Sequence, residues 1–336
     1  MTRKCEYCSS TISDSEEIKV GNSYYHLSCA ISYINKLKKQ NQNFLLKLPN
    51  VIGIGIGWRH NKRLGFDKKE ICIVVNVNKK VPEAQLLSNQ LIPKWINDVK
   101  TDVLETFEIV APRPIEEAVD LRKGRMRPAK GGVSIGHIKI TAGTLGCLVR
   151  KEKESLILSN NHVLANENDA NHEDPILQPG PIDGGKDPED RIAYLENFIP
   201  IHFGYNMNYV DAAVAKPISE DLVSNEVLEI GKPTGVIEPT LGLKVIKSGR
   251  TTGLTHGEIV QVATTQRVRY RKGVALFDDQ IVIHPGSFSK GGDSGSAIFV
   301  DDNTRRICGL LFAGSARVTV ANPISNVLNT LGVSLP

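Results

Sequence analysis

Aromatic residues and long hydrophobic runs are scarce in this sequence. Phe, Trp and Tyr together make up 6% of the 336 residues, whereas glycine occurs 29 times. This balance favours short strands and tight turns over helical bundles. No stretch approaches the roughly 18 consecutive apolar residues that span a membrane, and the opening MTRKCEYCSS lacks the apolar segment of a signal peptide. We therefore expect a cytoplasmic protein without a membrane partner.

Strong charge of either sign and a regular cysteine framework are also lacking. Lys and Arg number 41 and Asp and Glu 37, a net charge of +4 that does not indicate nucleic acid binding. The chain length suggests two or three domains. Three of the six cysteines are scattered singly, and because cytoplasmic thiols stay reduced we expect these three to be small buried residues, namely Cys72, Cys147 and Cys308.

Two close pairs of metal-binding side chains stand near the amino terminus. Cys5 and Cys8 are separated by two residues, and so are His26 and Cys29. Four nitrogen and sulfur ligands suit tetrahedral zinc. A segment this short and polar buries too little apolar surface to fold without a bound metal ion. We predict structural zinc on these residues, followed by a short basic helix over 29–39. Two unrelated thiol pairs beside a surface histidine are the alternative.

The zinc spacing resembles one half of a LIM-type finger or a related treble-clef-like CCHC finger. This resemblance covers only about the first 40 residues. It implies a finger and basic helix over 1–43 that offers a binding surface, with a regulatory protein as its expected partner.

Residues 44–115 are typical of a small α+β domain. The runs at 51–58 (VIGIGIGW), 71–77 (ICIVVNV) and 101–110 (TDVLETFEIV) are rich in Val and Ile, as strands are. The GIGIG run suggests a dinucleotide site, but its third glycine comes one position early and no convincing acidic residue follows. We expect instead a strand that another backbone approaches closely.

A basic linker is expected over residues 116–130. We interpret it as a solvated connector, with an acidic partner or a proteolytic nick site as alternatives. Its basic residues are Arg122, Lys123, Arg125, Arg127 and Lys130.

Three later segments carry the residue types of a catalytic triad. His162 ends the apolar run LILSNNH, Asp211 begins a strand of small residues, and Ser294 lies in the glycine-rich GDSGS. A serine hydroxyl becomes a good nucleophile when an imidazole takes its proton, and a buried carboxylate fixes that imidazole. The N–H groups of Gly292 and Ser294 are predicted to hold the oxyanion of the tetrahedral intermediate.

The order His, Asp, Ser and the motif at 292–296 resemble chymotrypsin-like serine proteases. The segment VIKSGRTTGLTHGEI (245–259) is similar to the opening of the second barrel in bacterial members, and CGLLFAGS (308–315) to the strand that lines the specificity pocket. The wider chain resembles the bacterial and plant trypsin-like proteins that include the narrow-leaf family.

This resemblance implies a mostly β fold with two six-stranded antiparallel barrels, preceded by the small α+β domain and the zinc finger. The protease domain would span 131–336, with a first barrel over about 131–237 and a second over about 238–336. The sequence departs from the family in lacking an Ile-Val-Gly-Gly activation sequence and a half-cystine after His162, where Val163 stands. We therefore expect Asp293 not to pair with a newly cleaved amino terminus.

The resemblance also places a specificity pocket. Its floor would be Phe288, six residues before the nucleophile, with Gly314 and Val320 beside it. A buried cation without a carboxylate is unfavourable, so we expect cleavage after apolar residues, with Lys and Arg disfavoured. The acidic loop between His162 and Asp211 could hold calcium, but we expect it to be solvated and free of metal.

Three functional hypotheses follow. The first is an intracellular serine endopeptidase acting on protein or peptide substrates through an acyl-enzyme, with zinc purely structural and the amino-terminal modules recruiting substrate or regulating access. The second is a binding or assembly protein that retains an unused protease fold. The third is an esterase-like hydrolase that uses the same site. An oligomeric assembly is compatible with each.

Overall fold

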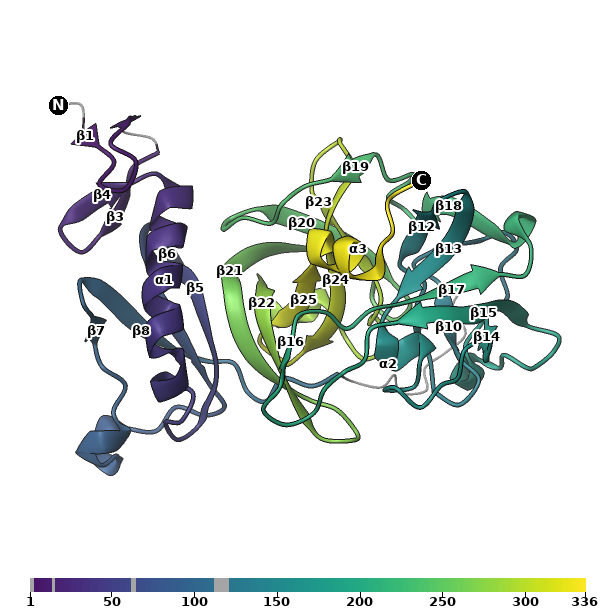
Figure 1. The fold of residues 1–336 in the computed structure, drawn as a ribbon, viewed down its shortest axis with the longest axis horizontal. Coiled ribbons are helices and arrows are strands. Elements are labelled where there is room, and N and C mark those ends of the chain that lie inside the picture. The colour runs from purple at the N-terminus through teal and green to yellow at the C-terminus, as the bar shows by residue number, and fades with distance from the viewer. Residues whose placement is uncertain (1–2, 14–15, 62–64, 112–120) are drawn as a thin grey trace.

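The computed structural model describes residues 3–13, 16–61, 65–111 and 121–336. Figure 1 shows three parts: an amino-terminal unit up to residue 111 in purple and blue, a ring-shaped sheet in green and yellow, and a further sheet mainly in teal. The ring lies between the other two, although it comes last in the chain. The described helices include none that is long and apolar enough to cross a membrane.

The amino-terminal unit is one helix packed on a small sheet. Helix α1 extends beyond the predicted 29–39 at both ends, because Ala30, Ile34, Leu37 and Leu45 bury one face of it in a core shared with the sheet. It also continues past residue 43, the expected limit of the finger. The elements are β1 (Arg3–Lys4), β2 (Thr11–Ile12), β3 (Ile18–Val20), β4 (Ser23–Tyr25), α1 (Leu27–Leu45), β5 (Val51–Asn61), β6 (Gly65–Val77), η1 (Glu83–Gln85), η2 (Ser88–Gln90), β7 (Trp95–Ile96) and β8 (Val99–Glu105).

Strand β5 joins this unit to the ring by a continuous sheet, because it pairs antiparallel with both β6 and β21 (Gly253–Arg269). The glycines of β5 permit this approach. A Cβ atom on Gly55 would lie 2.5 Å from Thr264 Oγ1, and one on Gly57 would lie 2.5 Å from the carbonyl oxygen of Val260. The expectation of a closely approached strand is therefore confirmed.

The ring is a closed antiparallel barrel of six strands, as expected for the second barrel. The strands pair in the order β20, β21, β22, β25, β24, β23, and β23 pairs again with β20. Its elements are β20 (Lys244–Gly249), β21, β22 (Val274–His284), η5 (Gly286–Phe288), β23 (Ala297–Val300), β24 (Arg306–Gly314), β25 (Thr319–Pro323) and α3 (Ile324–Leu331), with β16 (Met207–Asn208) and β19 (Gly235–Val236) added at its edges.

The seven-stranded sheet stands where the first six-stranded barrel was expected, and it differs from such a barrel. It is an open antiparallel sheet of seven strands in the order β11-β10-β14-β15-β17-β13-β12, and no described pairing joins β11 to β12. Its elements are β10 (Ser134–His137), β11 (Gly143–Thr144), β12 (Cys147–Lys151), β13 (Glu154–Ser159), α2 (Asn161–Leu164), β14 (Pro175–Leu177), η3 (Pro181–Asp183), β15 (Arg191–Phe198), β17 (Ala213–Pro217) and η4 (Glu220–Leu222), beside the separate parallel pair β9 (Ala129–Gly131) and β18 (Val223–Val227).

The expectation of a solvated basic linker is wrong for Arg122 and Lys123, which are buried, whereas Arg125 is exposed. Residues 116–120 of this linker lie outside the described ranges. The Arg122 side chain is buried, donates to Ser248 Oγ at 2.7 Å and pairs with Glu229. Lys123 is buried as well, and Arg127 donates to Gln178. These contacts fix the segment against the ring and against the seven-stranded sheet, because both offer hydrogen-bond acceptors to its buried cations.

Candidate functional site

The histidine and the aspartate come from the seven-stranded sheet. β13 ends at Ser159 and leads into the single turn α2, which carries His162. Asp211 stands two residues before β17, the neighbour of β13 in the sheet. His162 Nδ1 lies 2.6 Å from Asp211 Oδ2, and the His162 N–H donates to Asp211 Oδ1 at 3.3 Å. Two adjacent strands thus bring the predicted pair together.

The Asp211 carboxylate is fully buried and has a third partner that the sequence did not reveal. The Tyr270 hydroxyl donates to Asp211 Oδ2 at 2.8 Å. Burial, with the Asp211 charge adding to it, raises the pKa of Tyr270 well above its usual value, so that the hydroxyl keeps its proton. The backbone is fixed too, because Asn160 Nδ2 donates to the Asp211 carbonyl at 2.7 Å. A tyrosine at a strand end gives no sequence signal of this role.

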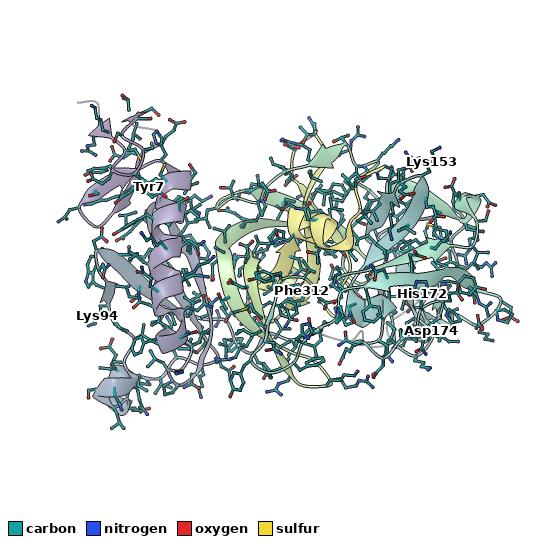
Figure 2. All side chains as sticks on the ribbon, viewed as in Figure 1. Tyr7, Lys94, Lys153, His172, Asp174 and Phe312 are labelled. Carbon is teal, nitrogen blue, oxygen red and sulfur yellow. The ribbon has the colours of Figure 1, made fainter. Side chains whose placement is uncertain are left out.

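The serine lies in a tight turn of the ring, between η5 and β23. Gly292 and Gly295 on either side have φ of 96° and 94°, a region that favours glycine. Thr144 of the seven-stranded sheet donates its N–H to the Ser294 carbonyl at 2.8 Å, so the turn faces that sheet. Phe312, labelled in Figure 2, belongs to β24 and is fully buried.

The Ser294 hydroxyl is turned away from the histidine. Ser294 Oγ donates to the carbonyl oxygen of Phe312 at 3.4 Å. Within the described residues His162 Nε2 is buried and has no hydrogen-bond partner. A rotation of the serine side chain is therefore needed before Oγ can pass its proton to Nε2.

The predicted oxyanion donors are both placed in the turn. The Gly292 carbonyl accepts from Thr144 Oγ1 at 2.8 Å, which orients that peptide. Among the described contacts, neither the Gly292 N–H nor the Ser294 N–H donates to a protein oxygen. Both donors are thus free for a ligand oxygen, while their role in catalysis stays a prediction.

Asp293 has an internal cation as its partner. Its Oδ2 lies 3.6 Å from Lys247 Nζ, and neither side chain is exposed. Asp293 also accepts from the Thr251 N–H at 2.8 Å and the Thr252 hydroxyl at 2.7 Å. In this chain Lys247 is thus the cation beside Asp293, and the sequence did not identify it.

The two apolar side chains predicted for the pocket belong to different clusters, and their role as a pocket stays a prediction. Phe288 is 1% exposed and belongs to the core shared by the ring and the amino-terminal unit, with the Lys247 ammonium 5.8 Å from its ring centroid. Val320 packs in a different cluster with Phe312. Gly314 pairs with Thr319 on β25. The side chain of Phe288 points into the barrel core, because η5 folds back over β21.

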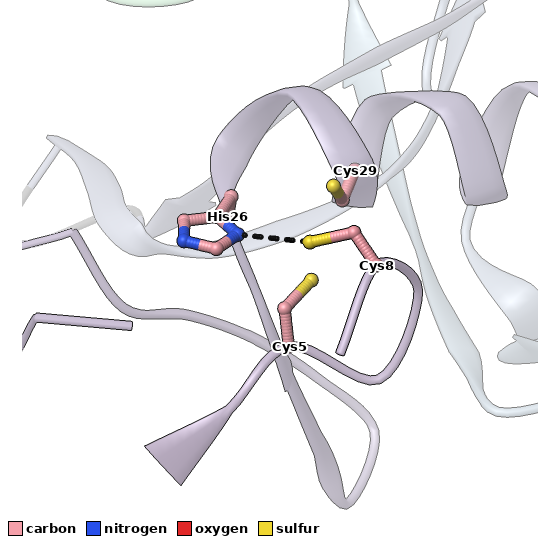
Figure 3. Close-up of side chains that lie close together, drawn as sticks. All are labelled: Cys5, Cys8, His26 and Cys29. Atoms are coloured by element: carbon pink, nitrogen blue, oxygen red, sulfur yellow. Dashed lines mark hydrogen bonds between the residues drawn. The ribbon is translucent and has the colours of Figure 1, made fainter. Parts of the chain in front are cut away.

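The four predicted zinc ligands converge, as Figure 3 shows. Their ligand atoms all lie within 4.8 Å of one another, and Cys8 Sγ is 3.5 Å from His26 Nδ1. Around tetrahedral zinc such atoms would be roughly 3.4–3.8 Å apart. Burial opposes ionisation of Cys5, but hydrogen bonds from the backbone of Cys8 and His26 outweigh it and lower its pKa to about 6. A thiolate is the form that binds metal, so the cluster suits an ion such as zinc.

Carboxylates in the acidic loop after His162 pair with side chains of this same chain. Asp183 takes a bidentate pair from the buried Arg250, at 2.5 and 2.6 Å. Asp190 pairs with Arg125, and Asp174 lies 3.0 Å from His137. In Figure 2 Asp174 lies at the end of the molecule away from the amino-terminal unit. The expectation of a merely solvated loop is wrong for these residues. The single cysteines Cys72, Cys147 and Cys308 are buried free thiols, as expected.

Part of the chain matches a known protein family, and several solved bacterial protease structures align with the chain at low identity. Residues 181–322 match the family model of the Nal1 C-terminal domain. No curated protein matches the chain. Solved structures with a similar fold include Protease A of Thermobifida fusca, with 20% identity, a TM-score of 0.45, and coverage of 61% of this chain and 97% of that one. A chymotrypsin from Cellulomonas bogoriensis has 17% identity, a TM-score of 0.44, and coverage of 62% and 97%.

The match to the Nal1 C-terminal domain includes Asp211 and Ser294 but not His162. This chain combines that match with the His162–Asp211 pair, a serine in a turn that contains two glycines of positive φ, and the amino-terminal Cys/His cluster. The chain is thus a mostly β protein that carries, over residues 181–322, a segment matching the narrow-leaf-related Nal1 C-terminal domain.

Proposed function

We propose that this chain is a serine endopeptidase. The observation that carries the proposal is the contact of 2.6 Å between His162 Nδ1 and Oδ2 of the fully buried Asp211. The other ring nitrogen, His162 Nε2, has no hydrogen-bond partner among the described residues. A buried carboxylate fixes the imidazole tautomer and stabilises its protonated form.

The reaction uses the chain's own groups. Ser294 Oγ rotates from the Phe312 carbonyl to His162, transfers its proton to Nε2, and forms a bond to the carbonyl carbon of the substrate. The N–H groups of Gly292 and Ser294 stabilise the resulting oxyanion. The imidazolium returns the proton to the leaving amine, and water then releases the acyl group by the same steps.

Two further functions use the same site. A protein that binds peptides without cleaving them is favoured by one observation, the donation of Ser294 Oγ to Phe312 instead of His162. An esterase would need the same groups as a peptidase. Hydrolysis of an internal peptide bond separates an endopeptidase from the other two. Hydrolysis of a simple ester then separates an esterase from a protein that only binds peptides.

Mutation tests the assignment. Ser294→Ala and His162→Ala should each lower kcat by about 10⁶, because triad members act as a unit. Ser287→Ala changes an exposed serine nearby and should leave kcat unaltered. Retention of near-wild-type peptidase activity by either triad variant would refute these roles.

We also propose a preference for the residue that precedes the scissile bond. We expect cleavage after apolar residues, supported by the apolar cluster of Phe312 and Val320. The nearby carboxylates are already engaged, Asp278 by Lys38 and Asp279 by Asn326. A peptide library should show Lys and Arg disfavoured before the scissile bond, and a dominant preference for either would contradict this.

The amino-terminal cluster is proposed to hold structural zinc and to recruit a regulatory protein or substrate in the cytoplasm. Its support is the convergence of the four ligand atoms within 4.8 Å of one another. Cleaved termini compared between cells with wild type and with Cys8→Ser test this. Unchanged substrates at equal protein level would argue against recruitment.

A further inference from the structure

Val110, in the segment that leads out of the amino-terminal unit, is paired with the ring beside the serine. The Val110 N–H donates to the Gly314 carbonyl at 3.0 Å, and the Gly314 N–H donates to the Val110 carbonyl at 2.9 Å. The two residues form an antiparallel bridge. This exchange of both hydrogen bonds is how a strand adds to a free sheet edge.

The edge that Val110 occupies leads directly to the nucleophile. Backbone groups of alternate residues point to the same side of a strand, so Phe312 and Gly314 share this edge. The Phe312 carbonyl is the group that accepts from Ser294 Oγ. An extended peptide paired antiparallel with Gly314 would therefore place the residue two positions further along opposite Phe312, with its carbonyl group at the serine.

The two residues that flank Val110 are held by backbone hydrogen bonds to Arg269. The Arg269 N–H donates to the Ile109 carbonyl at 2.9 Å, and the Ala111 N–H donates to the Arg269 carbonyl at 3.1 Å. Ile109 is 1% exposed and packs in the cluster that contains Phe312 and Val320. Upstream, Ser315 Oγ donates to the carbonyl of Thr106 at 2.6 Å. The contact is thus built into the fold.

The same segment borders a cavity at the histidine. This cavity has a volume of about 330 Å³ and is lined by His162 and Tyr270 together with Val110 and Ala111. The segment therefore stands where the residues of a bound peptide that precede the scissile bond would lie next to the imidazole.

We propose that residues 109–111 occupy the substrate-binding edge of the protease site, so that the chain restrains its own active site until this segment is displaced. The inference rests on the proposed function, since it assumes that Ser294 acts on peptides. The inference predicts that the enzyme hydrolyses short substrates normally and peptide substrates more slowly. A substrate that pairs with Gly314 must compete with Val110, whereas an ester of a single amino acid needs only the serine and the oxyanion donors.

The test compares two substitutions of one residue. Val110→Pro removes the N–H that donates to Gly314, whereas Val110→Ala keeps both backbone hydrogen bonds. For a tetrapeptide amide, kcat/KM should rise at least tenfold in Val110→Pro and stay within threefold of wild type in Val110→Ala. Hydrolysis of a single-residue ester should be equal in all three proteins. An unchanged or lowered peptide rate in Val110→Pro, with ester hydrolysis intact, would overturn the inference.

A second measurement uses the wild-type protein, in case Val110→Pro does not fold. A tetrapeptidyl phosphonate bound to Ser294 should increase deuterium uptake at 106–111, whereas a small fluorophosphonate should not. Equal uptake with both reagents would overturn the inference while leaving the nucleophile established. Failure of both reagents to react, and of the ester to be hydrolysed, would instead contradict the proposed function itself.

Discussion

Lys247 and Asp293 form an ion pair with 3.6 Å between Nζ and Oδ2 and with neither side chain exposed. Burial lowers the pKa of Lys247 to about 8, against the opposing influence of Asp293. Because Asp293 precedes the nucleophile, the charge of Lys247 holds the turn that carries Ser294. We expect activity to fall as pH rises through about 8, where Lys247 becomes neutral and Asp293 loses its cation.

Stability should change in the opposite direction over that range. An unfolded lysine has a pKa of about 10.4, so between about 8 and 10.4 the unfolded chain binds more protons at this group. The contribution of Lys247 to the free energy of unfolding therefore rises with pH there. In Lys247→Arg the alkaline limb of the pH–activity profile should move upward by at least one unit. An alkaline limb that stays near 8 in this variant would assign it to another group.

Tyr270→Phe tests the third partner of the buried carboxylate. The variant loses the hydrogen bond to Asp211 Oδ2. A hydrogen bond to a charged group contributes about 1.5–3 kcal/mol, so we expect kcat to fall at least tenfold with little change in KM. Tyr209→Phe, at an exposed tyrosine, is the control. Equal kinetics for Tyr270→Phe and wild type would mean that Asp211 needs no such support.

Zinc removal should unfold only part of the amino-terminal unit. Structural zinc in small fingers contributes roughly 10–16 kcal/mol of apparent binding free energy. A chelator or Cys8→Ser should expose residues 5–30 to deuterium exchange, while the rest of α1 stays protected by its apolar core. Cys147→Ala, at a buried thiol elsewhere, should retain the metal. Native protein that contains no zinc by elemental analysis would exclude this assignment.

Lys38 joins helix α1 to the ring from a fully buried position. Its Nζ donates to the Ala263 carbonyl at 2.5 Å and to Thr265 Oγ1 at 3.0 Å, with Asp278 Oδ1 at 3.5 Å. Lys38→Met leaves the Asp278 charge without its partner, so the free energy of unfolding should fall by about 3–5 kcal/mol. Lys39→Met, at an exposed position, should have little effect.

Tryptophan fluorescence is a selective readout for this change. The chain has two tryptophans, Trp58 and Trp95, and both belong to the amino-terminal unit. Urea unfolding followed by fluorescence therefore reports on that unit. If Lys38→Met/Asp278→Asn is as unstable as Lys38→Met alone, the loss does not arise from an unpaired carboxylate.

Features that depend on residues close together in the sequence could be predicted. The Cys/His spacing predicted the metal cluster, because two-residue gaps bring ligands onto single turns. The alternation of Gly with Ile in β5 indicated close backbone approach, and the structure has β21 there. His162 and Asp211 could be paired because each follows or precedes a strand of recognisable pattern.

Features that depend on contacts between distant segments of the chain could not be predicted from the sequence. Lys38 looked like a surface residue of a basic helix, since lysine is almost never buried unless paired. Its partners lie more than two hundred residues away. The bridge between Val110 and Gly314 has no sequence signature, because it uses only backbone atoms. Phe288 was placed by a count from Ser294, and the fold of η5 turned its ring into the core.

Covalent labelling is the decisive test of a nucleophilic Ser294. The full-length protein is treated with a fluorophosphonate probe, and the modified residue is located by mass spectrometry. We predict one label per chain, on Ser294, with no label in Ser294→Ala and much slower labelling in His162→Ala. A folded wild-type protein that stays unlabelled, or a label that persists in Ser294→Ala, would contradict the assignment of Ser294 as the nucleophile.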